Sequence, residues 1–108
     1  MQKSKVFTYI GFAIRAKKLR TGTNAIKTLK GDVFLLIICK TASKNTFKEV
    51  EKFGQKFDCP ILISNTVTVE EIVNKENCKI MAICDRELSK AIIASSGEDF
   101  REFSGGKI

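Results

Sequence analysis

The sequence predicts a single-domain α/β fold, in which a β-sheet lies between layers of helices. Three observations support this expectation. The chain has 108 residues, which is the size of one domain. Segments with helical spacing of apolar residues alternate along the chain with short, continuous apolar runs. Such runs are typical of strands buried on both faces, and the alternation places a sheet between helices.

The first third of the chain is expected to hold two helices joined by a short extended segment. Apolar residues recur every three or four positions over residues 4–16, which is the spacing of an amphipathic helix. Residues 17–21 then form the extended segment. The second helix opens at one of residues 21–23 and reaches Leu29, and Gly31 ends it.

Three continuous apolar runs predict the central strands of the sheet. They cover residues 33–39, 60–64 and 80–84. Each run is shorter than the roughly 18 apolar residues that a membrane span needs. Between the first two runs, Thr41 or Ser43 caps a third helix.

Two further helices and a tail complete the chain. Residues 68–74 begin with the Thr-x-x-Glu spacing of a capping box, which predicts a short helix. Asp85 caps a final helix that runs to about Ser95. We therefore expect one domain over residues 1–97. Residues 98–108 are expected to form a flexible tail, because their Ser-Gly-Gly sequence favours no regular structure.

The positive charge of the chain is concentrated near its start. The formal net charge is +7. Residues 1–31 contain no acidic residue and eight basic ones, which are Lys3, Lys5, Arg15, Lys17, Lys18, Arg20, Lys27 and Lys30. The remaining residues hold eleven basic and twelve acidic side chains, a net charge of −1. This asymmetry indicates a polyanionic partner and favours nucleic acid over an anionic membrane surface.

The residue types present argue against an enzyme. The chain has no histidine, and none of its four cysteines forms a C-x-x-C pair. Neither a phosphate-binding loop nor a nucleophile motif occurs. We expect reduced cysteines that pack as small apolar residues, no metal, no cofactor, no small-molecule substrate and no catalytic residue. We also expect a cytoplasmic protein.

The joint between the extended segment and the second helix is the candidate binding site. The first amides of a helix have no partner within it and attract anions. Gly22 permits close approach of another backbone, and Thr23 and Asn24 offer hydrogen-bonding groups. Lys18 and Arg20, two apart on extended backbone, are expected to point to the same side and join them in one positive corner. The alternative is a capped helix with solvated lysines.

Several short motifs follow one another in a characteristic order. They are Gly-Phe-Ala at 11–13, Gly-Thr-Asn at 22–24, an apolar strand, and Ala-Ser-x-Asn-Thr at 42–46. In order and spacing, the stretch from Tyr9 to Val50 resembles bacterial members of the kink-turn-binding ribosomal protein superfamily. This superfamily includes the L-seven-Ae and L-thirty-type proteins, and its bacterial branch includes ribosome-associated proteins.

The resemblance extends to about Ser95 and implies a fold and a partner. The fold would be a three-layer α/β/α sandwich with a four-stranded mixed sheet. The partner would be structured, kink-turn-like RNA, with ribosomal RNA or the ribosome as its source. Binding would use the start of the second helix and the loop before the last strand.

The match to the RNA-binding motif of this superfamily is partial. Its members show Gly-x-Asn-Glu, with a lysine three residues after the glutamate. Gly22 and Asn24 match, Ala25 occupies the glutamate position, and Lys27 comes one residue early. The carboxylate that accepts from guanine is missing, whereas cations that contact phosphate remain. Because phosphate contacts give affinity and base contacts give specificity, the resemblance implies RNA affinity with a weaker or altered sequence preference.

Further candidates come from the loop before the last strand and from the segment after the first central strand. The complete set of candidate RNA-binding residues is Lys18, Arg20, Gly22, Thr23, Asn24, Lys27, Lys40, Lys44, Lys75, Asn77 and Lys79. Lysines also recur every four residues from Lys44 to Lys56, forming a stripe along the third helix. Glu49, which can pair with Lys52, and Glu51 favour a solvated face for that stripe.

Two other functions stay open from the sequence. One is a protein-interaction adaptor of the same fold that meets an acidic partner through its basic face. The other is a thiol-dependent redox protein. Salt dependence separates the RNA-binding protein and the adaptor from the redox protein. Thiol alkylation that left function unchanged would exclude the redox protein.

Overall fold

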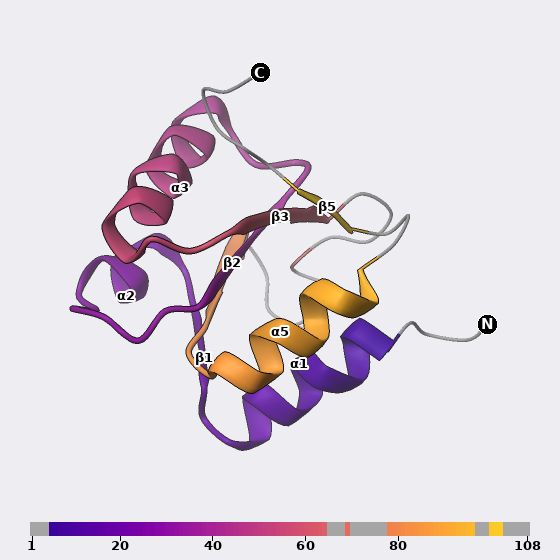
Figure 1. Ribbon diagram of the computed structural model, residues 1–108. Helices are drawn as coiled ribbons and strands as arrows, with labels where there is room; N and C mark the ends of the chain where they lie inside the picture. Colours follow the sequence, from indigo (N-terminus) through magenta and orange to yellow (C-terminus); the bar gives the residue numbers. More distant parts are fainter. Residues whose placement is uncertain (1–4, 65–68, 70–77, 97–99, 103–108) are drawn as a thin grey trace.

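The computed structural model describes residues 5–64, 69, 78–96 and 100–102 (Figure 1). Helices and strands alternate as expected up to residue 64 and again from residue 80. The elements are α1 Lys5–Arg15, β1 Leu19–Thr21, α2 Thr23–Lys27, β2 Leu35–Cys39, α3 Lys44–Phe57, β3 Ile61–Ser64, β4 Ile80–Ile83, α5 Arg86–Ser95 and β5 Phe100–Glu102. The capping box at residues 68–71 lies outside the described residues. No helix in the described ranges is both long enough and apolar enough to cross a membrane.

The strands form one mixed sheet in the order β1-β4-β2-β3-β5. Strands β2 and β3 are parallel, and the other neighbours are antiparallel. The first four strands are the mixed sheet that the resemblance implied. The fifth was not expected, because residues 98–108 were predicted to form a flexible tail.

That prediction is wrong for Phe100–Glu102, which pair with β3. The Phe100 side chain is 2% exposed, and its ring packs edge-on against Phe7, with centroids 6.3 Å apart. Burial of one such side chain contributes about 1.5–3 kcal/mol, which offsets the cost of ordering a short strand. The described part of the domain therefore extends past residue 97.

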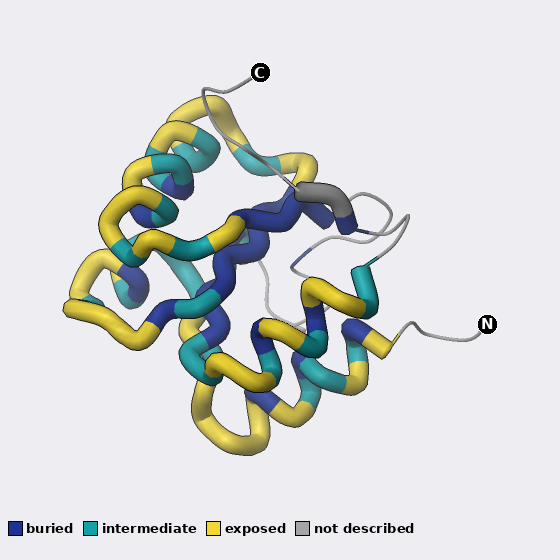
Figure 2. The backbone as a smooth tube through the Cα atoms, in the orientation of Figure 1, coloured by how far each residue is buried: buried dark blue, intermediate teal, exposed yellow. Residues whose placement is uncertain are grey.

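Helices cover both faces of the sheet. One buried cluster joins Leu35 and Ile37 of β2 to α1 and α5, and the other joins Leu36 and Ile38 to α2 and α3. Figure 1 shows α1 and α5 side by side on one face and α2 and α3 on the other. In Figure 2 the central strands β2, β3 and β4 are buried between the exposed outer faces of the helices. The three-layer α/β/α sandwich is thus confirmed.

Polar side chains set the starts of the two longest helices that follow strands. The Ser43 hydroxyl accepts from the Thr46 amide at 3.2 Å, and the Asp85 carboxylate accepts from the Leu88 amide at 2.9 Å. Both caps satisfy an amide that has no partner within the helix. The cap at Asp85 was expected, and Ser43 rather than Thr41 caps α3.

Helix α2 is shorter than expected. It ends at Lys27 instead of Leu29, and its N-cap residue is Gly22, which makes no side-chain hydrogen bond. The Thr28 hydroxyl donates to the Ala25 carbonyl at 2.8 Å. This local hydrogen bond competes with continued helix, so the chain leaves α2 after little more than one turn.

Two adjacent isoleucines of α5 provide a matched test of the core. The Ile92 side chain is fully buried, whereas Ile93 is 37% exposed. We expect Ile92→Ala to lower the free energy of unfolding by about 2–5 kcal/mol, because it leaves a cavity. Ile93→Ala should lower it by less than about 1 kcal/mol. Urea denaturation of both variants measures the difference, and equal losses would contradict the packing described for α5.

Candidate nucleic-acid interface

Three neighbouring strands bring candidate residues to one end of the sheet. The Gly22 amide, just after β1, donates to the Ile80 carbonyl at 3.0 Å. The Cys39 amide at the end of β2 donates to the Lys79 carbonyl at 2.7 Å. The start of α2, the residue after β2 and the residue before β4 therefore share this end. We call it the Gly22 end, and its residues are Gly22, Thr23, Asn24, Lys40, Lys44 and Lys79.

Gly22 has a backbone conformation that suits glycine alone. Its φ is 88° and its ψ is 148°, a region that L-residues almost never occupy. Its carbonyl accepts from the Ile26 amide at 3.2 Å. The amides of Thr23 and Asn24 have no acceptor within the described part of the chain. These two N–H groups are donors that a ligand can meet, and the Asn24 side chain beside them is exposed.

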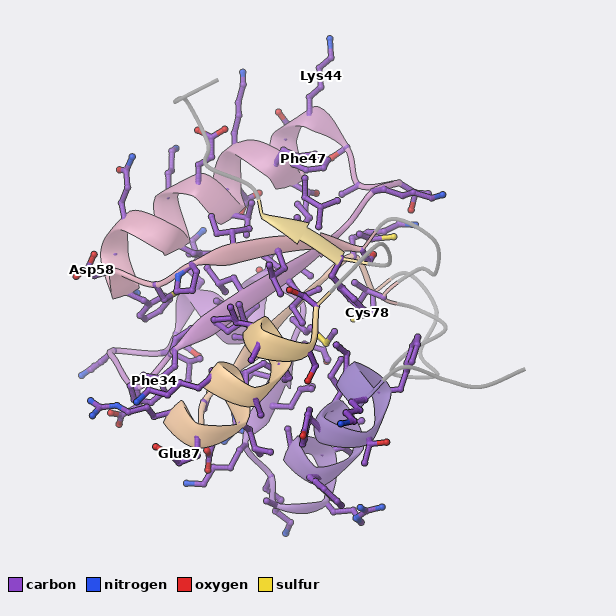
Figure 3. The ribbon with its side chains drawn as sticks, turned by 45° about the vertical axis from the view of Figure 1, so that its right-hand side comes forward. Phe34, Lys44, Phe47, Asp58, Cys78 and Glu87 are labelled. Atoms are coloured by element: carbon purple, nitrogen blue, oxygen red, sulfur yellow. The ribbon has the colours of Figure 1, made fainter. Side chains whose placement is uncertain are left out.

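Lysines surround this end. Lys40 follows β2 and Lys44 opens α3, and both are exposed. Figure 3 shows the Lys44 side chain projecting away from the start of α3. Lys79 is half-buried, and its ammonium donates to the Thr41 hydroxyl at 3.0 Å. Lys75 and Asn77 lie outside the described residues.

Lys18 and Arg20 lie elsewhere, so the single positive corner expected from the sequence is wrong for them. The Lys18 carbonyl accepts from the Cys84 amide at 2.7 Å, beyond the opposite end of β4. Gly22 comes four positions after Lys18 along extended chain, which is a distance of about 13 Å. The Arg20 guanidinium turns back towards Lys18 and donates to the Lys17 carbonyl at 3.0 Å.

The charges of Lys18 and Arg20 affect the pKa of the Cys84 thiol. Burial raises that pKa above its ordinary value, the charges of Arg20 and Lys18 oppose the rise, and Asp32 adds to it. The charges of Lys18 and Arg20 are thus both felt at Cys84. However, Asp32 lies near them and offsets part of their charge.

Lys27 sits at the far end of α2, where the helix meets α3. Its carbonyl accepts from the Lys56 ammonium at 3.3 Å. A hollow of about 320 Å³ between the two helices is lined by Lys27, Glu49, Lys52 and Phe53. The sequence did not indicate this hollow, because its two walls are 22 or more positions apart in the chain and only their packing creates it.

The four cysteines are free thiols. Burial raises the pKa of Cys39, but hydrogen bonds with the side chain and backbone of Thr41 and the backbone of Val69 outweigh it, so the net shift is downward. Burial and the charge of Asp58 raise the pKa of Cys59 to about 11. In the described ranges, no three histidine, cysteine or acidic side chains are grouped so that they could hold a metal ion.

The fold is shared with a solved structure. No model of a known protein family matches the chain, and no curated protein matches it. A protein with unknown function from Bacillus halodurans C has a similar structure, with a TM-score of 0.69 and 21% sequence identity. The alignment covers 85% of this chain and 96% of that one. At this identity the likeness concerns the fold alone.

The backbone strain at Gly22 can be tested against a second glycine. A Cβ at either Gly22 or Gly31 would meet no atom within 4 Å, but only Gly22 has a positive φ. We expect Gly22→Ala to lower the free energy of unfolding by about 1–3 kcal/mol, and Gly31→Ala to leave it within about 0.5 kcal/mol. Chemical denaturation measures both, and an unchanged Gly22→Ala variant would contradict the geometry of this turn.

The environment of Cys59 predicts its reactivity. The thiolate is the nucleophile, so the rate of alkylation by iodoacetamide should rise with pH towards a midpoint near about 11 in the folded protein. In concentrated urea, where burial is lost, the midpoint should fall to about 8.5. Mass spectrometry of the Cys59 peptide follows the reaction. An identical midpoint in both states would show that folding does not bury this thiol.

Proposed function

We propose that this chain is a non-catalytic protein that binds structured, kink-turn-like RNA through the Gly22 end of the sheet. The observation that carries the proposal is the convergence of three features there. They are the amides of Thr23 and Asn24, which have no acceptor in the described part of the chain, the exposed Asn24 side chain, and the exposed lysines Lys40 and Lys44. Together they match the charge and the acceptor oxygens of a ribose-phosphate chain.

Each group has a distinct part in this proposal. The two amides donate to phosphate oxygens, as amides at the start of helices do. Gly22 has no side chain, so the RNA backbone can approach them closely. Lys40 and Lys44 neutralise neighbouring phosphates and release counterions, which supplies most of the affinity. Asn24 can donate to or accept from a base edge or a 2′-hydroxyl.

The residue at position 25 limits how bases are distinguished. Ala25 has no carboxylate, so the guanines of sheared G·A pairs would lose an acceptor that kink-turn proteins supply. We infer that the protein prefers the shape of a bent RNA backbone and discriminates weakly between base sequences. From the resemblance we infer further that the RNA is ribosomal and that the protein acts in the cytoplasm with the ribosome.

Neutralising two lysines tests the site. The variant Lys40→Gln/Lys44→Gln should bind a kink-turn RNA about tenfold or more weakly than the parent at about 100 mM salt, since two phosphate contacts are lost. The control is Lys5→Gln/Lys90→Gln, which removes the same charge from exposed positions of α1 and α5 on the other face of the sheet. Fluorescence anisotropy measures both. Equal weakening by the two variants would contradict binding at the Gly22 end.

The ionic-strength dependence tests the nature of the contact. With about four phosphate contacts, affinity should fall about 100-fold between about 50 and 200 mM salt. Replacing the sheared G·A pairs by Watson–Crick pairs, which straightens the RNA, should weaken binding more than changing other bases. Undetectable binding of either RNA by the parent at the lowest salt would refute the proposed function.

A further inference from the structure

The outer face of α3 carries four cations and no exposed acid. Its exposed residues are Lys44, Asn45, Lys48, Lys52, Gln55 and Lys56. The two acidic residues of the helix, Glu49 and Glu51, are half-buried. The stripe of lysines recognised in the sequence is therefore a continuous positive surface, which we call the α3 lysine row.

Among the residues that the structure describes, no ion pair neutralises the lysines of this row. The sequence suggested that Glu49 would pair with Lys52, but within the described ranges neither residue takes part in an ion pair. Lys44 and Lys48 likewise have no ion-pair partner there. The Lys56 ammonium donates to a carbonyl and lies 5.0 Å from the centroid of the Phe57 ring, and neither contact cancels its charge.

The row is continuous with the Gly22 end. Lys44 belongs to both surfaces, and at the other end of α2 Lys27 lines the same hollow as Lys52. Lysines four residues apart on a helix are about 6 Å apart along its axis, so the row from Lys44 to Lys56 extends about 18 Å. This length suits a run of phosphates better than a single small anion.

We propose that the α3 lysine row is a second RNA contact, which holds the phosphate backbone of a duplex that continues from the segment bound at the Gly22 end. This inference rests on the proposed function. Lysine ammonium groups bind phosphate without reading bases, so the contact is independent of sequence. Glu49 lines the hollow and repels a phosphate there. The RNA backbone therefore binds the exposed lysines of the row and not the hollow.

The composition of the row favours RNA over an acidic protein. Protein interfaces have a core of aromatic and other apolar side chains and are depleted in lysine. The aromatic residues of α3 face inwards, since Phe53 is buried and Phe47 and Phe57 are half-buried. No large apolar side chain of α3 is exposed, so the row offers a protein partner charge but no apolar anchor.

Two RNAs and three double variants test the second contact. One RNA contains the kink-turn with minimal flanking helix, and the other adds a duplex of about 16 base pairs. The row variant is Lys48→Gln/Lys52→Gln, which leaves Lys44 in place. Its comparisons are Lys40→Gln/Lys44→Gln at the Gly22 end and the control Lys5→Gln/Lys90→Gln. All three variants lose the same charge, and circular dichroism checks that each is folded.

We expect the row variant to bind the extended RNA about tenfold or more weakly than the parent, with a salt slope smaller by about 1.4–1.8. Its affinity for the short RNA should change less than about twofold. The variant Lys48→Arg/Lys52→Arg, which keeps the charge, should bind the extended RNA like the parent. A merely structural role for the lysines would not give this dependence on RNA length.

Three results would overturn the inference. If the row variant bound the extended RNA as tightly as the parent, the second contact would be refuted, whereas the proposed function would still stand. Weakened capture of an acidic protein, with unchanged RNA affinity, would assign the row to a protein partner. If the parent binds neither RNA, the proposed function and the second contact both fail.

Discussion

Burial of β2 on both faces is the constraint on which the rest of the structure depends. All five residues from Leu35 to Cys39 are 0% exposed, and their side chains alternate between two apolar clusters. Since a strand of this kind is stable only when both of its faces are covered, α1 with α5 and α2 with α3 must pack at once. The same strand fixes where Lys40 leaves the sheet and which carbonyl, that of Lys79, lies opposite Cys39. The same strand therefore organises the core and positions residues of the candidate site.

Most of the fold could be predicted from local patterns. Apolar runs identified the central strands, helical spacing identified α1 to within one residue at each end, and capping residues identified the starts of α3 and α5. Two errors concern short elements, and they have different physical causes. The strand at residues 100–102 forms because the Phe100 side chain is buried and packs against Phe7, which is far away in the sequence. Helix α2 ends early because the Thr28 hydroxyl donates to the Ala25 carbonyl. Neither partner is evident from the spacing of apolar residues.

The candidate site was less predictable, because sequence proximity was taken for spatial proximity. Lys18 and Gly22 are close in the chain, but a strand lies between them and carries them to opposite ends. In contrast, Lys40 and Lys79 are far from Gly22 in sequence and come to its end through the pairing of β1, β4 and β2. The order of strands in a mixed sheet decides such groupings, and composition does not reveal that order. The charge of α3 was visible in the sequence, but whether Glu49 would neutralise it depended on side-chain geometry.

The position of β1 has a consequence for association between copies of the chain. This strand ends the sheet order, so one of its sides has no neighbouring strand among the described residues. Open edges of this kind invite pairing with another molecule, and natural proteins protect them by keeping the strand short and placing cations on it. Only three residues long, β1 carries Arg20 at its centre and follows Lys18. If two β1 strands paired edge to edge, their positive charges would repel each other. Such short strands would form only a few hydrogen bonds to offset this repulsion. Lys18 and Arg20 thus disfavour edge-to-edge pairing of two copies of the chain, whether or not a ligand is bound.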